Sequence, residues 1–210
     1  MFTILRCAVP LFIASVVLAG QGPQRDIDDH VAGTTLAYFE KVGDGVYKGS
    51  KPKTDADYEF LQKQHIKYIL DLELLPSLRH SEQKKAQRHR IVLLHARINA
   101  SPISPSEKHI ERIMAVLKDS RYHPIYFHCA YGRERTSLVA ALYKVYYLGM
   151  SPQDALRYMD ESGYKNSWVR GGLKRYLRKH PSPRAGFKNE RSNPALSKPD
   201  ISSVLLRPSR

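Results

Sequence analysis

The stretch of residues 125–148 constrains the fold more than any other part of the chain. An apolar run of strand type ends at Cys129, a short loop surrounds Gly132, and a helical pattern opens at Arg135 and Thr136. The free backbone N–H groups and the positive dipole end at the start of a helix favour negative charge. A strand, loop and helix in this order therefore predict an α/β domain with an anion-binding loop at the carboxyl edge of its sheet.

The residue types in this loop suit both a phosphate and a nucleophile. Cys129 lies next to the start of the helix and to Arg135, and both neighbours favour an ionised thiol, so we expect a thiolate at neutral pH. The planar guanidinium of Arg135 can bind two phosphate oxygens at once, and Thr136 places a hydroxyl near the sulfur. The residues expected to bind the anion are Ala130, Tyr131, Gly132, Arg133, Glu134 and Arg135.

The same loop carries a resemblance to a known family. His128 and Cys129, followed by five residues and then Arg135 and Thr136, resemble the signature loop of the cysteine-dependent protein-tyrosine and dual-specificity phosphatases. Residues from about 39 to 177 resemble the small bacterial dual-specificity-like members, with segments 45–52 and 149–155 as further points of similarity. The resemblance implies an α/β fold with a central, mostly parallel sheet flanked by helices, and a phosphoric monoester hydrolase.

The resemblance also implies roles for the loop residues. Cys129 attacks phosphorus and forms a phosphocysteine, while Arg135 and the loop amides hold the oxygens of the phosphoryl group. Water then hydrolyses the intermediate, and Thr136 assists the departure of the thiolate. His128 orients the loop or tunes the thiolate, with a histidine that is merely packed as the alternative. No metal or other cofactor is expected, because Arg135 and the loop supply the positive charge.

The general acid departs from the family pattern. Relatives carry an aspartate on a loop upstream of the cysteine, whereas residues 97–100 here read Arg-Ile-Asn-Ala, which puts Asn99 in that region. An amide cannot donate a proton as a carboxylic acid does. Glu134 is the leading substitute, because some lipid-phosphatase relatives carry an acidic residue at this loop position. Asp71, at the end of a predicted strand, is the second candidate, with a structural hydrogen-bonding role as its alternative.

Three other roles for Cys129 fit the sequence less well. A buried structural cysteine is common, but the strand-to-helix placement beside Arg135 argues for a functional one. A zinc site lacks the spaced cysteine and histidine partners that tetrahedral coordination needs. A cysteine protease would need a distant histidine, and it would leave Arg135 and the glycine-containing loop without a purpose.

The charge of the chain points to an anionic partner. It has 34 Lys and Arg against 20 Asp and Glu, a formal net charge of +14, which suits a polyphosphorylated substrate or a nucleic acid. Nucleic acid is not the expected partner, because no finger or aromatic RNA-binding motif is present. With Arg133 in the loop, the charge favours inositol polyphosphates or phosphoinositides alongside phosphotyrosine-like aryl phosphates. A non-catalytic phosphate-binding or nucleic-acid-binding protein is the alternative.

The chain is expected to divide into four parts. Residues 1–20 resemble a secretory signal peptide, which predicts an exported protein, periplasmic or secreted, with an uncleaved anchor or a misassigned start as the alternatives. Cleavage would leave Cys129 as the single cysteine. Residues 21–38 are a flexible lead-in, residues 39–180 form the phosphatase domain, and residues 181–210 form a basic, disordered tail that is solvated or contacts an anionic surface. We expect a monomer.

Local patterns predict the elements of the domain. Strands are expected at residues 46–48, 67–74, 91–98 and 124–128, and helices at 54–64, 104–118, 155–160 and 168–178. Thr54, Ser104 and Ser151 are the expected helix caps. The basic residues within 76–90 are expected to form a solvated surface that flanks the mouth of the anion site.

Overall fold

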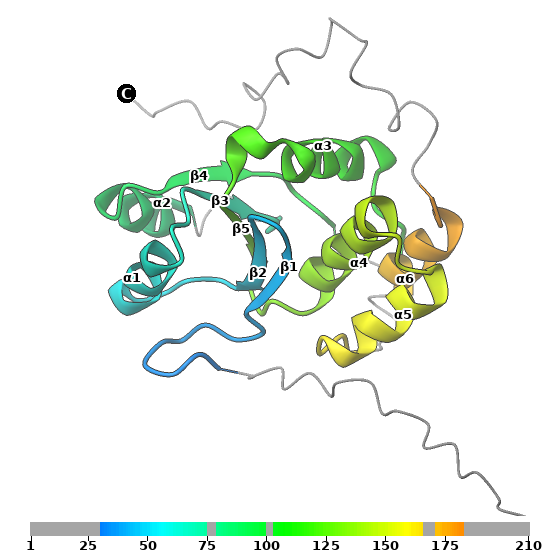
Figure 1. Ribbon diagram of the computed structural model, residues 1–210, viewed down its shortest axis with the longest axis horizontal. Helices are drawn as coiled ribbons and strands as arrows, with labels where there is room; N and C mark the ends of the chain where they lie inside the picture. Colours follow the sequence, from blue (N-terminus) through cyan, green and yellow to red (C-terminus); the bar gives the residue numbers. More distant parts are fainter. Residues whose placement is uncertain (1–29, 75–78, 100–102, 166–170, 183–210) are drawn as a thin grey trace, which may run out of the picture.

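The computed structural model describes residues 30–74, 79–99, 103–165 and 171–182 (Figure 1). Within these ranges one five-stranded sheet has the order β1-β2-β5-β3-β4, in which only the β1–β2 pair is antiparallel. The strands are β1 Glu40–Gly43, β2 Val46–Ser50, β3 Tyr68–Asp71, β4 Val92–His95 and β5 Ile125–Cys129. The predicted α/β fold with a central, mostly parallel sheet is confirmed.

Helices cover both faces of this sheet (Figure 1). In the described ranges they are α1 Asp55–Lys63, α2 Arg79–Arg88, α3 Glu107–Lys118, the short 3₁₀ helix η2 Ser120–Tyr122, α4 Glu134–Leu148, α5 Pro152–Glu161 and α6 Gly171–Lys179. One buried cluster joins the sheet to α1 and α2, and a larger one joins it to α3, α4, α5 and α6.

The central strand β5 feeds both clusters, because successive side chains of a strand point to opposite faces. Ile125, Phe127 and Cys129 belong to the cluster with α3 to α6, whereas Tyr126 belongs to the cluster with α1 and α2. By the same alternation His128 faces α1 and α2. The strand therefore ends with Cys129 on one face of the sheet and the side chain before it on the other.

Two of the three predicted helix caps are confirmed. Thr54 forms a capping box with Asp57 at the start of α1, and the Ser151 hydroxyl accepts from the backbone N–H of Asp154 at the start of α5. The prediction for Ser104 is wrong, because the N-cap of α3 is Ser106, which keeps an extended backbone (φ −65°, ψ 129°) and makes no side-chain capping bond.

The predicted lead-in of residues 21–38 needs a correction at its end. Leu36 is fully buried against the α1–α2 face. Thr35 donates from its backbone N–H to Asp57 at 2.6 Å, and Ala37 donates to the hydroxyl of Ser50 at 2.9 Å. These residues therefore belong to the packed domain, which begins before residue 39. The predicted signal peptide and nearly all of the predicted tail lie outside the described residues.

The basic stretch 76–90 forms more structure than its composition predicts. Its described part contains α2, in which Glu82 and Ala86 are buried while Lys84 and Arg88 are exposed. The expected solvated surface is therefore only the outer side of a helix whose inner side packs on the sheet. Among the described residues no helix is long and apolar enough to span a membrane.

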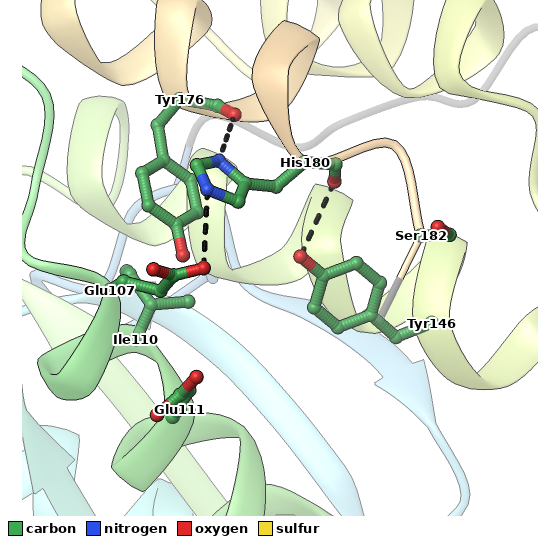
Figure 2. Close-up of a pocket in the computed structure, with 7 residues that line it drawn as sticks. All are labelled: Glu107, Ile110, Glu111, Tyr146, Tyr176, His180 and Ser182. Carbon is green, nitrogen blue, oxygen red and sulfur yellow. Dashed lines mark hydrogen bonds and ion pairs between the residues drawn. The ribbon is translucent and has the colours of Figure 1, made fainter. Parts of the chain in front are cut away.

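The residues at the end of α6 contact α3 and α4 around a small pocket (Figure 2). The His180 ring stacks on Tyr176 with centroids 4.1 Å apart, and its Nε2 lies 3.4 Å from the Glu107 carboxylate. The hydroxyl of Tyr146 donates to the carbonyl of His180 at 3.3 Å. These contacts hold the chain against the domain up to residue 180.

Candidate active site

The candidate nucleophile lies at the carboxyl end of the central strand. Cys129 is the last residue of β5, is only 2% exposed, and is a free thiol. The chain then turns at Gly132, whose φ of +71° is in the region that favours glycine. A Cβ at Gly132 would lie 2.6 Å from the backbone of Gly49 and of Ser50. The loop is thus pressed against the end of β2, where only glycine fits.

The loop runs directly into the start of α4. Arg133 is the N-cap and makes no side-chain capping bond with any described residue, and Glu134 is the first helical residue. The first amides of a helix have no intrahelical acceptors, and the dipole gives this end positive character. The start of α4, which follows the loop after Cys129, is therefore suited to an anion, and binding of an anion there stays a prediction.

Three donor groups in this segment are buried without a partner among the described residues. They are Nε of Arg133, Nε of Arg135 and Oγ1 of Thr136. Buried polar atoms in folded proteins are nearly always hydrogen-bonded, because an unpaired one loses its hydration without compensation. These donors lie close to Cys129 in the chain, so they are suited to bind a ligand that accepts hydrogen bonds, such as an oxyanion.

Arg133 and Tyr131 form the outer part of the loop. The guanidinium of Arg133 lies 5.1 Å from the ring centroid of Tyr131, and Tyr131 is 59% exposed. A cation over an aromatic face is held by the ring quadrupole. The pair presents a positive charge and a flat apolar surface beside the loop.

The His128 ring is hydrogen-bonded to a buried carboxylate as well as packed. The ring is fully buried and places Nε2 2.7 Å from Oε1 of Glu82 in α2. Burial by itself lowers the pKa of His128, but the charge and hydrogen bond of Glu82, together with Asp71 and Glu73, raise it to about 9. These contacts favour the imidazolium form of the residue that precedes Cys129.

Sequence reasoning missed the partners of this imidazolium. Lys51, just after β2, lies 2.8 Å from Oε2 of Glu73 and 2.9 Å from Oε2 of Glu82. Carboxylate oxygens of Asp71, Glu73 and Glu82 lie within 4.8 Å of one another, close enough to bind a metal ion. Here Lys51 contacts Glu73 and Glu82, His128 contacts Glu82, and Asp71 pairs with His95. In the sequence, the one signal that could have pointed to these contacts is Glu82, an isolated acidic residue within the basic stretch 76–90.

Comparison with protein families decides the assignment. The family model described as the tyrosine phosphatase family matches residues 35–147, which span the sheet, the loop and nearly all of α4. The chain belongs to the tyrosine phosphatase family. It is therefore a phosphatase, a hydrolase of phosphate esters, as the resemblance of the loop predicts. A comparison with curated protein sequences found no match.

Solved structures of phosphatases share the fold. The core catalytic domain of the PP-IP phosphatase SIW14 from S. cerevisiae has a TM-score of 0.58 at 17% identity, over 67% of this chain and 83% of that one. TpbA from P. aeruginosa has a TM-score of 0.59 at 18% identity, over 74% and 91%. Tk-PTP has a TM-score of 0.55 at 16% identity, over 68% and 97%. At these identities the similarity shows the fold.

The two acid candidates of the phosphatase occupy different environments. Glu134 is 5% exposed in the first turn of α4, between Arg133 and Arg135. Asp71 is fully buried at the end of β3, where it pairs with Nδ1 of His95 at 2.9 Å and accepts the backbone N–H of Glu73 at 2.7 Å.

The bonds of Asp71 keep it ionised. Burial raises the pKa of Asp71, but the hydrogen bond from His95, the charge of His128 and the N–H of Glu73 lower it to about 2. A carboxyl group in this state carries no proton to donate at neutral pH. These contacts agree with the structural alternative for Asp71 and leave Glu134 as the stronger candidate. Asn99 is exposed on the segment that follows β4.

Proposed function

We propose that this phosphatase hydrolyses phosphomonoesters through a phosphocysteine intermediate. The observation that carries the proposal is the buried free thiol of Cys129 in one short segment with donors of Arg133, Arg135 and Thr136 that lack a partner in the described part of the chain. A nucleophile beside preorganised donors can form a covalent intermediate and stabilise the charge that develops on the transferred group.

The reaction proceeds in two displacements. In the first, Sγ of Cys129 attacks phosphorus, the bond to the ester oxygen breaks, and the leaving oxygen takes a proton from the general acid. The guanidinium of Arg135 and the loop amides bind the three remaining oxygens. In the second, water attacks phosphorus, the P–S bond breaks with the help of the Thr136 hydroxyl, and inorganic phosphate leaves. No step needs a metal ion.

The substrates are phosphate esters with additional negative charge or an aromatic leaving group. Arg133 adds a cation next to Arg135, and its stacking partner Tyr131 offers a flat surface to an aryl group. Inositol polyphosphates, phosphoinositides and phosphotyrosine-like aryl phosphates fit these features. Among the relatives of similar fold, SIW14 is described as a PP-IP phosphatase, and TpbA has been solved in complex with pTyr.

The pattern of the first 20 residues supports a proposal for the compartment in which the protein acts. Residues 1–20 have the pattern of a signal peptide, which supports export to the periplasm or the medium. Removal of this segment takes Cys7 away and leaves Cys129 without an intramolecular disulfide partner. The protein acts there as a monomer, and its basic tail is solvated, with contact to an anionic surface as the alternative.

Phosphate release from a substrate panel tests the function. The panel contains an aryl phosphate, a phosphotyrosine peptide and an inositol polyphosphate, each measured with and without a metal chelator. We expect turnover of all three at rates that the chelator leaves unchanged. Absence of release from every substrate would favour a non-catalytic phosphate-binding protein, and loss of activity that a divalent ion restores would contradict the metal-free mechanism.

The substitution Glu134→Gln tests the general acid. An alkyl leaving group needs a proton far more than a phenol does, because its alkoxide is the stronger base. We expect Glu134→Gln to slow hydrolysis of an alkyl phosphate by about 10² to 10⁴ and that of an acidic aryl phosphate much less. The ratio of the two rates, measured by phosphate release, is the readout.

Asp71→Asn is the matched control for this experiment. If Glu134 only braces the neighbouring arginines, Glu134→Gln should depress both substrates alike. Equal losses in Glu134→Gln together with a selective loss on the alkyl phosphate in Asp71→Asn would transfer the acid role to Asp71.

A further inference from the structure

Three ion-paired side chains, two of them fully buried, lie on the α1–α2 face of the sheet. They are Lys51 after β2, Glu82 in α2 and His128 in β5, joined through contacts of 2.9 Å and 2.7 Å. The exposed fractions of the three side chains are 14%, 1% and 0%. Segments that are distant in sequence therefore meet in one ion-paired path that ends one residue before Cys129.

The backbone pairing of β5 fixes the position of His128 relative to Cys129. His128 and Cys129 are neighbours on β5, held by pairing with Gly49 and Ser50 of β2 on one side. On the other side, the carbonyl of His128 accepts the backbone N–H of Leu72 at 2.8 Å. The backbone of His128 is thus fixed by two neighbouring strands, and its ring is held at Nε2 by the carboxylate of Glu82. A change at Glu82 reaches the loop through this ring.

We propose that Glu82 is a positioning residue of the phosphatase: it holds the side chain of His128, the residue before Cys129, in place from the opposite face of the sheet, while Lys51 holds Glu82. The inference rests on the proposed function, since it assigns a role in preparing the nucleophile. Glu82 contacts no reacting atom and acts through His128.

The surroundings of His128 explain why one carboxylate is decisive. Burial opposes a charged ring, and Glu82 is the carboxylate bonded directly to it. Other ionisable groups near this part of the sheet include Tyr58 in α1, Asp71 in β3, Glu73 after β3, His95 in β4, Lys51 after β2, and Tyr126 and Cys129 in β5. Asp71 is bonded to His95, and Glu73 to Lys51, so neither replaces the direct bond.

Replacing Glu82 by glutamine keeps the shape and removes the charge. Burial should then lower the pKa of His128 so that the ring is neutral at pH 7.5, and Cys129 should lose one neighbouring positive charge. We expect the rate of Cys129 alkylation by iodoacetamide at pH 7 to fall about tenfold. The rate is followed by mass spectrometry of the Cys129 peptide, because the full chain also contains Cys7. The titration of the His128 ring is followed by NMR.

A matched control and a double variant separate this role from general damage. Glu73→Gln also removes a carboxylate bonded to Lys51 but keeps the Glu82–His128 bond, and it should change alkylation by no more than about twofold. In a His128→Gln background, adding Glu82→Gln should cause no further loss, because the carboxylate acts through the ring. If Glu82→Gln does not fold, as judged by circular dichroism, Glu82→Asp decides, since its retained charge should keep alkylation within about threefold.

Three results would overturn the proposal. They are a His128 ring that stays charged at pH 7.5 in Glu82→Gln, alkylation that matches the native rate, and losses that add in the double variant. A tenfold loss in Glu82→Asp would contradict it as well. Alkylation and ring titration need no substrate, so failure of the phosphatase assay and failure of this inference are distinguishable.

Discussion

The substitution Cys129→Ser should lower phosphate release from an aryl phosphate by at least about 10⁴-fold. A serine hydroxyl at this position stays protonated and is a far weaker nucleophile, while the loop backbone that binds the anion is unchanged. Calorimetry with the phosphotyrosine peptide should therefore show that binding persists. Cys129 is buried at the end of β5. Serine is nearly the same size as cysteine, so the packing there should stay intact.

The outcome for Cys129→Ser has a sharp alternative. Activity retained within about tenfold of the native rate would show that another group attacks phosphorus. Loss of binding together with turnover would show instead that the substitution had disrupted the loop. Only loss of turnover with binding preserved supports a nucleophilic role.

The substitution Arg135→Lys should cost about 10² to 10³ in kcat even though the charge is kept. An ammonium is a point charge and cannot form the two parallel bonds that a guanidinium makes with phosphate oxygens. Nε of Arg135 is buried without a partner among the described residues, which leaves it available to the transferred group. The steady-state rate on an aryl phosphate measures this loss.

Arg133→Lys is the comparison for Arg135→Lys, because both change a guanidinium in the same loop. Arg133 lies over the exposed ring of Tyr131, so its replacement should raise KM for a polyphosphorylated substrate and lower kcat on the aryl phosphate less. A near-native rate for Arg135→Lys would assign Arg135 a structural role.

The parts of the fold that depend on local sequence were predictable. The strand, loop and helix at residues 125–148 correspond to β5, the loop and α4. The caps Thr54 and Ser151 begin helices as expected. These features depend on residues within a few positions of one another, so the sequence carries them directly.

Other parts of the fold depend on contacts that no local pattern contains. The edge strand β1 is only four residues long and was not predicted. Its Glu40 accepts the Tyr158 hydroxyl at 2.6 Å and pairs with Lys144 at 3.1 Å, both distant in sequence. The boundary near residue 39 failed for the same reason, because Leu36 becomes a core residue only when α1 and the sheet come together.

The candidate site divides in the same way. Cys129 and Arg135 follow from the spacing within one loop, and Gly132 from the turn between them. The bond between Glu82 and His128 joins positions 46 residues apart, and a glutamate in a basic run is ordinarily a surface residue. The proton donor depends on a substrate pose, so Glu134 remains a prediction for the leaving-group experiment.

Detection of a phosphocysteine tests the central claim most directly. The native protein is mixed with an excess of a fast aryl phosphate, denatured within its turnover time, and digested for mass spectrometry. We expect one phosphoryl group on the Cys129 peptide, absent from Cys129→Ser and accumulating when Thr136→Ala slows the second step. Rapid phosphate release with the Cys129 peptide unmodified at every quench time, or with the phosphoryl group on another residue, would contradict it.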